Sequence, residues 1–139
     1  MVSTGSCLCG GVKYEVTGPL RPVVYCHCEQ CRKTSGHHVA ASSAPRDKVK
    51  IIGDVRWYPS SSTAQRGFCP TCGGNLFWDG PGKNISIMAG TLDNADIRAM
   101  GHIFVADKAR YVEICDGLPQ AAQDDVEITT MAHKPDPLT

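Results

Sequence analysis

Neither sign of charge is in excess in this chain of 139 residues, which holds 14 lysines and arginines against 14 acidic residues. This balance excludes a generally basic nucleic-acid binder, and the 42% share of hydrophobic residues excludes a disordered chain. No apolar run approaches the length of about 20 residues that a membrane-spanning helix needs, so we expect no membrane partner. The amino terminus lacks the basic start and apolar stretch of a secretory signal, which predicts a cytoplasmic protein.

Cysteine is the residue in clear excess, with eight in the chain. Such a set either staples a secreted domain with disulfides or holds metal as thiolates in a reducing compartment. The missing secretory signal favours metal. The spacing does too, because cysteines two or three residues apart close a strained disulfide loop but can share one ion at about 2.3 Å. The cysteines stand as Cys7-Leu-Cys9, Cys26-His-Cys28-Glu-Gln-Cys31, Cys69-Pro-Thr-Cys72 and Cys115.

Short alternating apolar runs separated by turn residues predict a mainly β fold. The runs recur every 8–12 residues, which is typical of antiparallel sheets built from hairpins. We therefore expect short antiparallel sheets stapled by zinc, with one or two short helices. The expected strands are Val12–Val16, Val23–Cys26, Val39–Ser42, Val49–Ile52, Val55–Tyr58, Asn75–Trp78, Ile85–Ala89, His102–Val105 and Tyr111–Ile114.

Two segments have the pattern of short helices. Glu29–Thr34 is followed by a Ser-Gly pair, and Asn94–Met100 is followed by Gly101. Glycine is favoured just after the last helical residue because it adopts the left-handed conformation that ends a helix. We expect both segments to be helical.

The length is that of one ordinary domain and too short for two independent cores. We expect a single zinc domain over residues 1–119. Residues 120–139 hold four acidic residues against one lysine, which predicts an acidic C-terminal extension that is only partly ordered. Within it, Val126–Thr130 is the expected terminal strand, followed by a frayed end.

Seven clustered cysteines can be divided between two ions without a leftover. Structural zinc takes four protein ligands, and catalytic zinc takes three and keeps one position open. The two pairs predict one closed, structural site, which would tie the amino terminus to the middle of the chain and supply folding free energy. The triple would then hold a second ion with a vacancy. The pairs are Cys7 with Cys9 and Cys69 with Cys72, and the triple is Cys26, Cys28 and Cys31.

The triple can also be closed by a fourth protein ligand, which would make it a second structural site. A histidine between two ligands often points away from the ion that they share, which makes His27 a poor fourth ligand. The candidates for this closed alternative are His27, His37, His38 and Cys115.

An open zinc ion on three thiolates favours sulfur chemistry. The ion and its three ligands carry a net charge of −1, which weakens the acidification of a bound water and suits a soft sulfur ligand. A thiol substrate could be bound as thiolate and directed at a carbon electrophile, and the reverse reaction would release the sulfur. Arg32, Lys33 and Arg66 could receive substrate carboxylates if they flank this site, and ordinary surface charge is the alternative.

Six segments of the chain resemble the glutathione-dependent formaldehyde-activating enzyme family, which includes the centromere protein V relatives. The resemblance covers about residues 5–119. It is carried by Gly-Ser-Cys7-Leu-Cys9-Gly-Gly, Cys26-His-Cys28-Glu-Gln-Cys31-Arg-Lys-Thr-Ser-Gly36 and Phe68-Cys-Pro-Thr-Cys72-Gly-Gly-Asn-Leu-Phe77, and by the later segments Ala89-Gly-Thr-Leu-Asp93, His102-Ile-Phe-Val105 and Asp116-Gly-Leu-Pro119.

The resemblance implies a mostly β, tent-like fold and two zinc ions in each chain. It implies Cys7, Cys9, Cys69 and Cys72 as ligands of the structural zinc, and Cys26, Cys28 and Cys31 as ligands of the catalytic one. The implied activity is that of a carbon–sulfur lyase, which condenses glutathione with formaldehyde to S-hydroxymethylglutathione and catalyses the reverse. The expected partner is thus a small-molecule thiol, glutathione or its adduct. Cys115 lies outside the pattern and is expected to be a small buried hydrophobic residue.

Two other functions remain open on the sequence alone. A non-catalytic zinc module that binds a protein partner would have a coordinatively saturated second ion. A hydrolase of a small imine or carbonyl compound would use zinc-bound hydroxide, and its rate would follow the ionisation of that water without an added thiol.

Overall fold

The computed structural model describes residues 1–131 and confirms a mainly β fold with a few short helices. The chain divides into two compact units, which we call unit 1 (Met1–Leu20 and Ser42–Asp96) and unit 2 (Arg21–Ala41 and the chain from Ile97 onward). The strands are β1 (Val2–Ser6), β2 (Lys13–Thr17), β3 (Val23–Cys26), β4 (Val39–Pro45), β5 (Val49–Ile52), β6 (Arg56–Pro59), β7 (Gln65–Phe68), β8 (Asn75–Asp79), β9 (Asn84–Met88) and β10 (Ala99–Ile103). The helices are α1 (Glu29–Ser35) and α2 (Val126–Met131), with short 3₁₀ turns at Arg46–Lys48, Ala89–Thr91 and Val105–Asp107.

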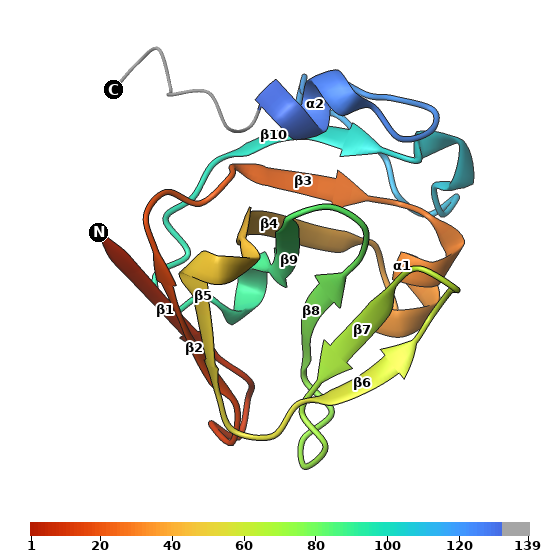
Figure 1. The fold of residues 1–139 in the computed structure, drawn as a ribbon. Helices are drawn as coiled ribbons and strands as arrows, with labels where there is room; N and C mark the ends of the chain where they lie inside the picture. Colours follow the sequence, from red (N-terminus) through yellow and green to blue (C-terminus); the bar gives the residue numbers. More distant parts are fainter. Residues whose placement is uncertain (132–139) are drawn as a thin grey trace. The chain divides into compact units, whose positions relative to one another are not determined.

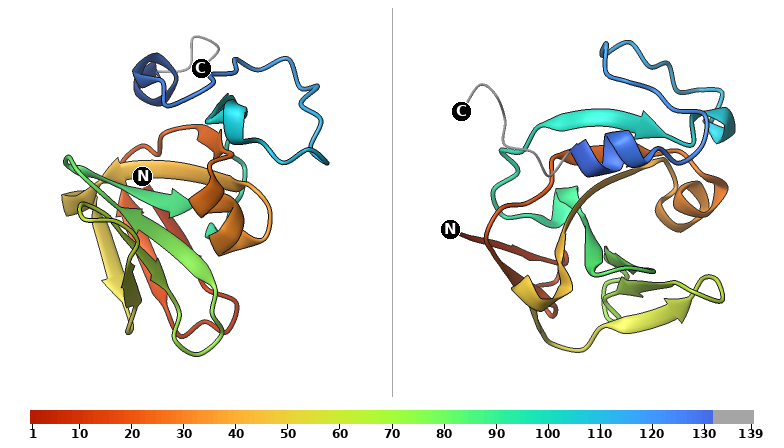
Figure 2. Two further views of the ribbon diagram at one scale, coloured as in Figure 1. Left: turned by 90° about the vertical axis from the view of Figure 1, so that its right-hand side faces the viewer. Right: turned by 45° about the horizontal axis from the view of Figure 1, so that its top comes forward.

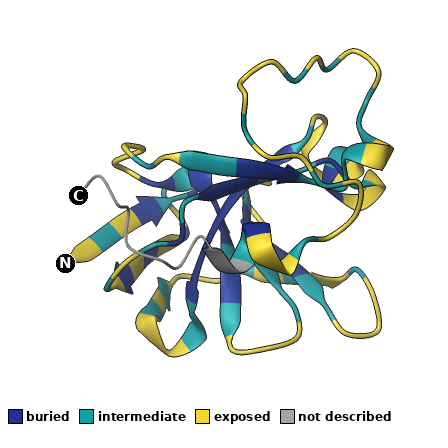
Figure 3. Ribbon diagram, turned by 90° about the horizontal axis from the view of Figure 1, so that it is seen from above, coloured by how far each residue is buried: buried dark blue, intermediate teal, exposed yellow. Residues whose placement is uncertain are grey.

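Unit 1 contains a three-stranded antiparallel sheet in which β2 lies between β1 and β5 (Figure 1). Along β2 the side chains alternate between buried and exposed, which places Tyr14 and Val16 in the core. The Tyr14 ring packs edge-on against the buried Phe77 ring of β8, with ring centroids 5.4 Å apart. Buried residues are concentrated on the strands and exposed ones on the loops between them (Figure 3).

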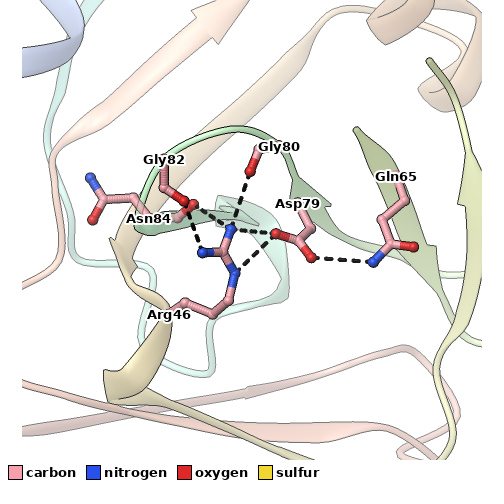
Figure 4. Close-up of polar contacts among 6 residues, drawn as sticks. All are labelled: Arg46, Gln65, Asp79, Gly80, Gly82 and Asn84. Atoms are coloured by element: carbon pink, nitrogen blue, oxygen red, sulfur yellow. Dashed lines mark hydrogen bonds and ion pairs between the residues drawn. The ribbon is translucent and has the colours of Figure 1, made fainter. Parts of the chain in front are cut away.

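The rest of unit 1 is a run of antiparallel neighbours, from β6 through β7 and β8 to β9. The loop between β8 and β9 is held by Arg46, whose guanidinium donates to the backbone carbonyls of Gly80, Gly82 and Asn84 (Figure 4). The same guanidinium forms an ion pair with Asp79, whose other carboxylate oxygen accepts from Gln65 on β7. One arginine thus joins the end of β8, the loop and the start of β9.

Replacing this arginine should lower the stability of unit 1. In Arg46→Ala the carbonyls and the Asp79 carboxylate lose their donor, and hydrogen bonds to charged groups contribute about 1.5–3 kcal/mol each when well formed. Because the Arg46 side chain is 40% exposed, we expect a total loss of about 1–3 kcal/mol, measured by urea unfolding. Lys48→Ala, at an exposed position of the same 3₁₀ turn, should change the free energy of unfolding by less than about 0.5 kcal/mol. Equal unfolding curves for the two variants would contradict the assigned role of Arg46.

Unit 2 is built around β3, which pairs antiparallel with residues 39–41 of β4 and parallel with β10. The parallel pair departs from the expectation of antiparallel pairing throughout. Helix α2 lies against β10, where a side chain on Gly101 would collide with Ile128 (Figure 2).

Within residues 1–131, no helix is long and apolar enough to cross a membrane. The expectation of one domain over residues 1–119 with an acidic extension stays a prediction, and its frayed end at residues 132–139 lies outside the described residues.

Three expected elements are wrong. Asn94–Met100 is not helical: the Asn94 side chain accepts the backbone N–H of Asp96 at 3.0 Å in a local turn, and Ala99 and Met100 already belong to β10. Tyr111–Ile114 keeps its alternating burial but is not a strand. Val126–Thr130 lies in α2 instead of a strand, since the Asp125 carboxylate accepts the backbone N–H groups of Glu127 and Ile128 and caps a helix.

Candidate metal centres

Four cysteines from two loops of unit 1 converge on one point, as the sequence predicted. Cys7 and Cys9 lie between β1 and β2, and Cys69 and Cys72 lie between β7 and β8. Their Sγ atoms all lie within 4.8 Å of one another, and the Cys7–Cys9 and Cys9–Cys69 sulfurs are 3.7 Å apart. Sulfurs bound to a tetrahedral zinc ion at about 2.3 Å lie about 3.8 Å apart, whereas a disulfide holds them at about 2.05 Å. This group, the quartet, can therefore hold a metal ion, and its spacing fits zinc.

Backbone N–H groups point at the sulfurs of the quartet. Gly11 donates to Cys9 at 3.4 Å, Val12 donates to Cys7 at 3.3 Å, and Cys69 accepts from the two residues that follow Pro70. Such donors stabilise the negative charge of metal-bound thiolates. Gly73, which follows Cys72, adopts a φ of +76°, a left-handed conformation that glycine takes without strain.

The thiols of the quartet influence one another strongly. Backbone N–H groups of Cys9 and Gly74 lower the pKa of Cys72 to about 6. The Gly11 N–H also lowers the pKa of Cys9, but the neighbouring Cys69 and Cys7 sulfurs outweigh it and raise that pKa to about 11. Four thiolates at this separation therefore need a cation between them, which is what a metal ion supplies.

Three of the cysteines of unit 2 also converge. They lie where β3 passes into α1, a junction that Figure 2 shows. Cys26 ends β3, Cys28 is the N-terminal cap of α1, and Cys31 lies in its first turn. The Cys28 sulfur accepts the backbone N–H of Cys31 at 3.3 Å, and Gly36 ends the helix in the expected left-handed conformation. The three Sγ atoms lie within 4.8 Å of one another, so this group, the trio, can hold a metal ion as well.

The thiols of the trio also influence one another. Contacts with the Cys28 and Cys31 sulfurs, and then burial, raise the pKa of the Cys26 thiol well above its usual range. Cys31 is buried, and Cys26 and Cys28 are half-buried. Three thiolates here carry unfavourable mutual repulsion that a divalent ion would remove.

Within the described residues, no histidine, carboxylate or further cysteine joins the trio as a fourth ligand. His27 instead turns its fully buried ring toward His102, with His27 Nε2 and His102 Nδ1 2.9 Å apart. The His37 and His38 rings contact each other in a tilted arrangement, with ring centroids 4.1 Å apart, and His37 also stacks on Tyr111. Cys115 is exposed, so the expectation that it is buried is wrong: its segment is not a strand and gives it no core face.

A hydrogen-bonded chain of two buried histidines and an exposed aspartate escaped the sequence analysis. His102 lies between His27 and Asp116, with His102 Nε2 2.7 Å from Asp116 Oδ2. The backbone N–H of Leu118 and the His102 ring lower the pKa of Asp116, so its carboxylate accepts from His102 Nε2. Among residues 1–131, the buried His27 Nδ1 has no hydrogen-bond partner. Burial, followed by the nearby histidines, lowers the pKa of His27 to about 4.

The three candidate cations divide between the two units. Arg32 and Lys33 lie on α1 immediately after Cys31, in the same short helix. Arg66 is buried on β7 in unit 1, which argues against a place for it on an exposed surface. Arg32 and Lys33 thus lie in the same unit as the trio and next to it in the chain.

Comparison with known proteins places these centres in a family context. The family model described as glutathione-dependent formaldehyde-activating enzyme matches residues 2–107. An uncharacterized lyase of Schizosaccharomyces pombe is 35% identical over 75 residues, which are 53% of this chain and 55% of that protein. The matched part thus spans about half the length of this relative. A crystal structure of a Rhodobacter sphaeroides protein shares the fold, with a TM-score of 0.54 and 20% identity over 84% of this chain and 98% of its own.

Proposed function

Because the chain belongs to the glutathione-dependent formaldehyde-activating enzyme family, we propose that it is a zinc-dependent carbon–sulfur lyase. Its substrate would be the adduct of a small thiol and an aldehyde, of the S-hydroxymethylglutathione type. The reaction breaks one carbon–sulfur bond: the hydroxyl proton and the thiolate leave the adduct, and the carbonyl compound is released. The reverse reaction condenses the thiol and the aldehyde.

The observation that carries this proposal is the incomplete ligand set of the trio. Cys26, Cys28 and Cys31 supply three sulfurs, and no fourth protein ligand joins them within the described residues. Three protein ligands with one open position are the pattern of catalytic zinc, and four are the pattern of structural zinc. We therefore assign a structural zinc ion to the quartet and a catalytic one to the trio.

When bound at the trio, zinc would supply a soft Lewis-acid centre for the sulfur of the thiol or its adduct. The chain itself supplies the three thiolates and holds them at the junction of a strand and a helix. Cys28 fixes the first turn of α1 by accepting the Cys31 N–H. Arg32 and Lys33 carry positive charge on the same helix, where they can receive the carboxylates of a peptide thiol such as glutathione.

Cobalt substitution tests whether the second ion is open. We expect glutathione to change the visible absorption of the cobalt-loaded protein, because a thiolate would enter the coordination sphere of the trio ion. S-methylglutathione, whose sulfur cannot become a thiolate, should leave the spectrum unchanged. The same titration of Cys28→Ser, loaded at the quartet alone, gives the blank.

The other outcomes identify the alternatives. A spectrum that does not respond to any thiol would contradict the lyase proposal and favour a saturated, non-catalytic zinc module. Turnover of a carbonyl or imine compound without thiol, with a rate that follows the ionisation of a bound water, would favour a hydrolase.

A further inference from the structure

The backbone that carries Cys26 and Cys28 is held by hydrogen bonds of the residue between them. We call residues Cys26–Cys28 the metal-binding turn. Its central residue, His27, donates its backbone N–H to the carbonyl of Ile103 at 3.1 Å and joins its ring to His102 at 2.9 Å. Both hydrogen bonds are made to residues of β10, the parallel neighbour of β3.

His102 is itself held on three sides. Its backbone N–H donates to Pro119 at 2.9 Å, its carbonyl accepts from Ala121 at 2.9 Å, and its ring bonds to Asp116. The second oxygen of Asp116 accepts the backbone N–H of Leu118 at 3.0 Å, which fixes the carboxylate in a local turn. The positions of the His102 and His27 rings therefore depend on a carboxylate at the surface.

Ordinary core packing does not explain this chain of polar groups. Burying an imidazole is unfavourable unless its nitrogens are bonded, and an apolar side chain would fill the same space without that cost. His27 and His102 are 0% and 4% exposed, whereas the Asp116 side chain is 41% exposed. The hydrogen-bonded groups thus run from Asp116 at the surface to His27, the residue between Cys26 and Cys28. Groups that hydrogen-bond behind metal ligands and fix their orientation follow the same pattern.

We propose that Asp116 and His102 are positioning residues for the trio, which hold Cys26 and Cys28 in place through the side chain of His27. If His27 is fixed, metal binding has to order only the side-chain rotations of Cys26 and Cys28, because their backbone is already in place. If His27 is loosened, the backbone of the metal-binding turn must be ordered as well, and this lowers metal affinity. The inference rests on the trio being a metal centre, and not on the lyase reaction.

The test compares zinc affinity at the two centres, by competition with a chromophoric chelator, in the full-length protein. Asp116→Ala should lower the zinc affinity of the trio about tenfold, the low end of the effect of losing an outer partner of a metal ligand. The quartet should keep its affinity, whereas the unfolding temperature of the zinc-loaded protein should fall modestly, because the trio binds its ion more weakly and the buried His102 ring loses its acceptor. Asp116→Asn keeps an oxygen that accepts from His102 and should recover most of the lost affinity.

Asp107→Ala is the matched control, because it removes the same charge from an exposed position of unit 2. It should leave both affinities unchanged. The positioning role is overturned if Asp116→Ala binds zinc at the trio as Asp107→Ala does, or if it weakens both centres equally together with the unfolding temperature. A wild-type protein that binds a single zinc ion would instead remove the second metal centre, and with it the proposed function.

Discussion

Cys72→Ser should fail to form a stable unit 1. The quartet joins the loop after β1 to the loop after β7, two segments about sixty residues apart in the chain. Serine is a poor zinc ligand, so the variant loses the ion that links them. Structural zinc contributes about 10–16 kcal/mol of apparent binding free energy in small domains, and a whole domain is stable by only about 5–15 kcal/mol.

The expected result is a protein without a cooperative unfolding transition, with reduced β signal in circular dichroism. Cys115→Ser is the matched control, because it makes the same substitution at an exposed cysteine outside both groups. That variant should keep two zinc equivalents and the unfolding curve of the wild type. If Cys72→Ser keeps the wild-type transition, the quartet does not hold a structural ion.

The convergence of the cysteines was predictable because the information is local. A spacing of two or three residues brings a pair of sulfurs together in any loop conformation, so each pair could be assigned from the sequence. The partnership of the two pairs followed from counting ligands, and the structure confirms that Cys7 and Cys9 meet Cys69 and Cys72. Most strands were predictable for the same local reason, since alternation along β2 or β9 reflects one buried face.

In two of the three wrong elements, a polar side chain that bonds to the backbone overrode the pattern. The Asn94 turn removed an expected helix, and the Asp125 cap converted an expected strand of β-branched residues into α2. Two strands, β1 and β7, were missed because Val2–Ser6 and Gln65–Phe68 are short, with glycine inside each and little apolar alternation.

The histidine chain could not be found by local reasoning. His27 and His102 are 75 residues apart and become neighbours only through the parallel pairing of β3 with β10. Parallel pairing has no short turn that marks it in the sequence. The signals that could have helped were a histidine directly after one strand-like run, a second histidine within another, and an Asp-Gly turn at Asp116, and none of these is specific alone.

Cys28→Ser should separate the chemistry of the trio from the stability of the fold. Serine is among the best N-terminal caps, so it should still accept the Cys31 N–H and keep α1 in place. Its hydroxyl cannot replace a thiolate as a zinc ligand, and two sulfurs remain. The variant is therefore expected to hold one zinc equivalent, at the quartet, and to unfold as the wild type does apart from the stability that the second ion adds.

Cys28→Ser should also lose most of its catalytic rate. A bound ion that stabilises developing charge is worth several kcal/mol, and each 1.36 kcal/mol is a factor of ten in rate, so we expect a loss of about 10³-fold or more. The measurement is the rate of exchange between glutathione, formaldehyde and S-hydroxymethylglutathione by NMR, above the uncatalysed rate, with Cys115→Ser as the active control. If Cys28→Ser keeps both zinc ions, the division into quartet and trio is wrong; if it loses one ion and keeps the exchange rate, the trio is a metal centre but not the site of the reaction. Only the joint loss of one ion and the activity, with the fold retained, agrees with a catalytic zinc ion on three thiolates.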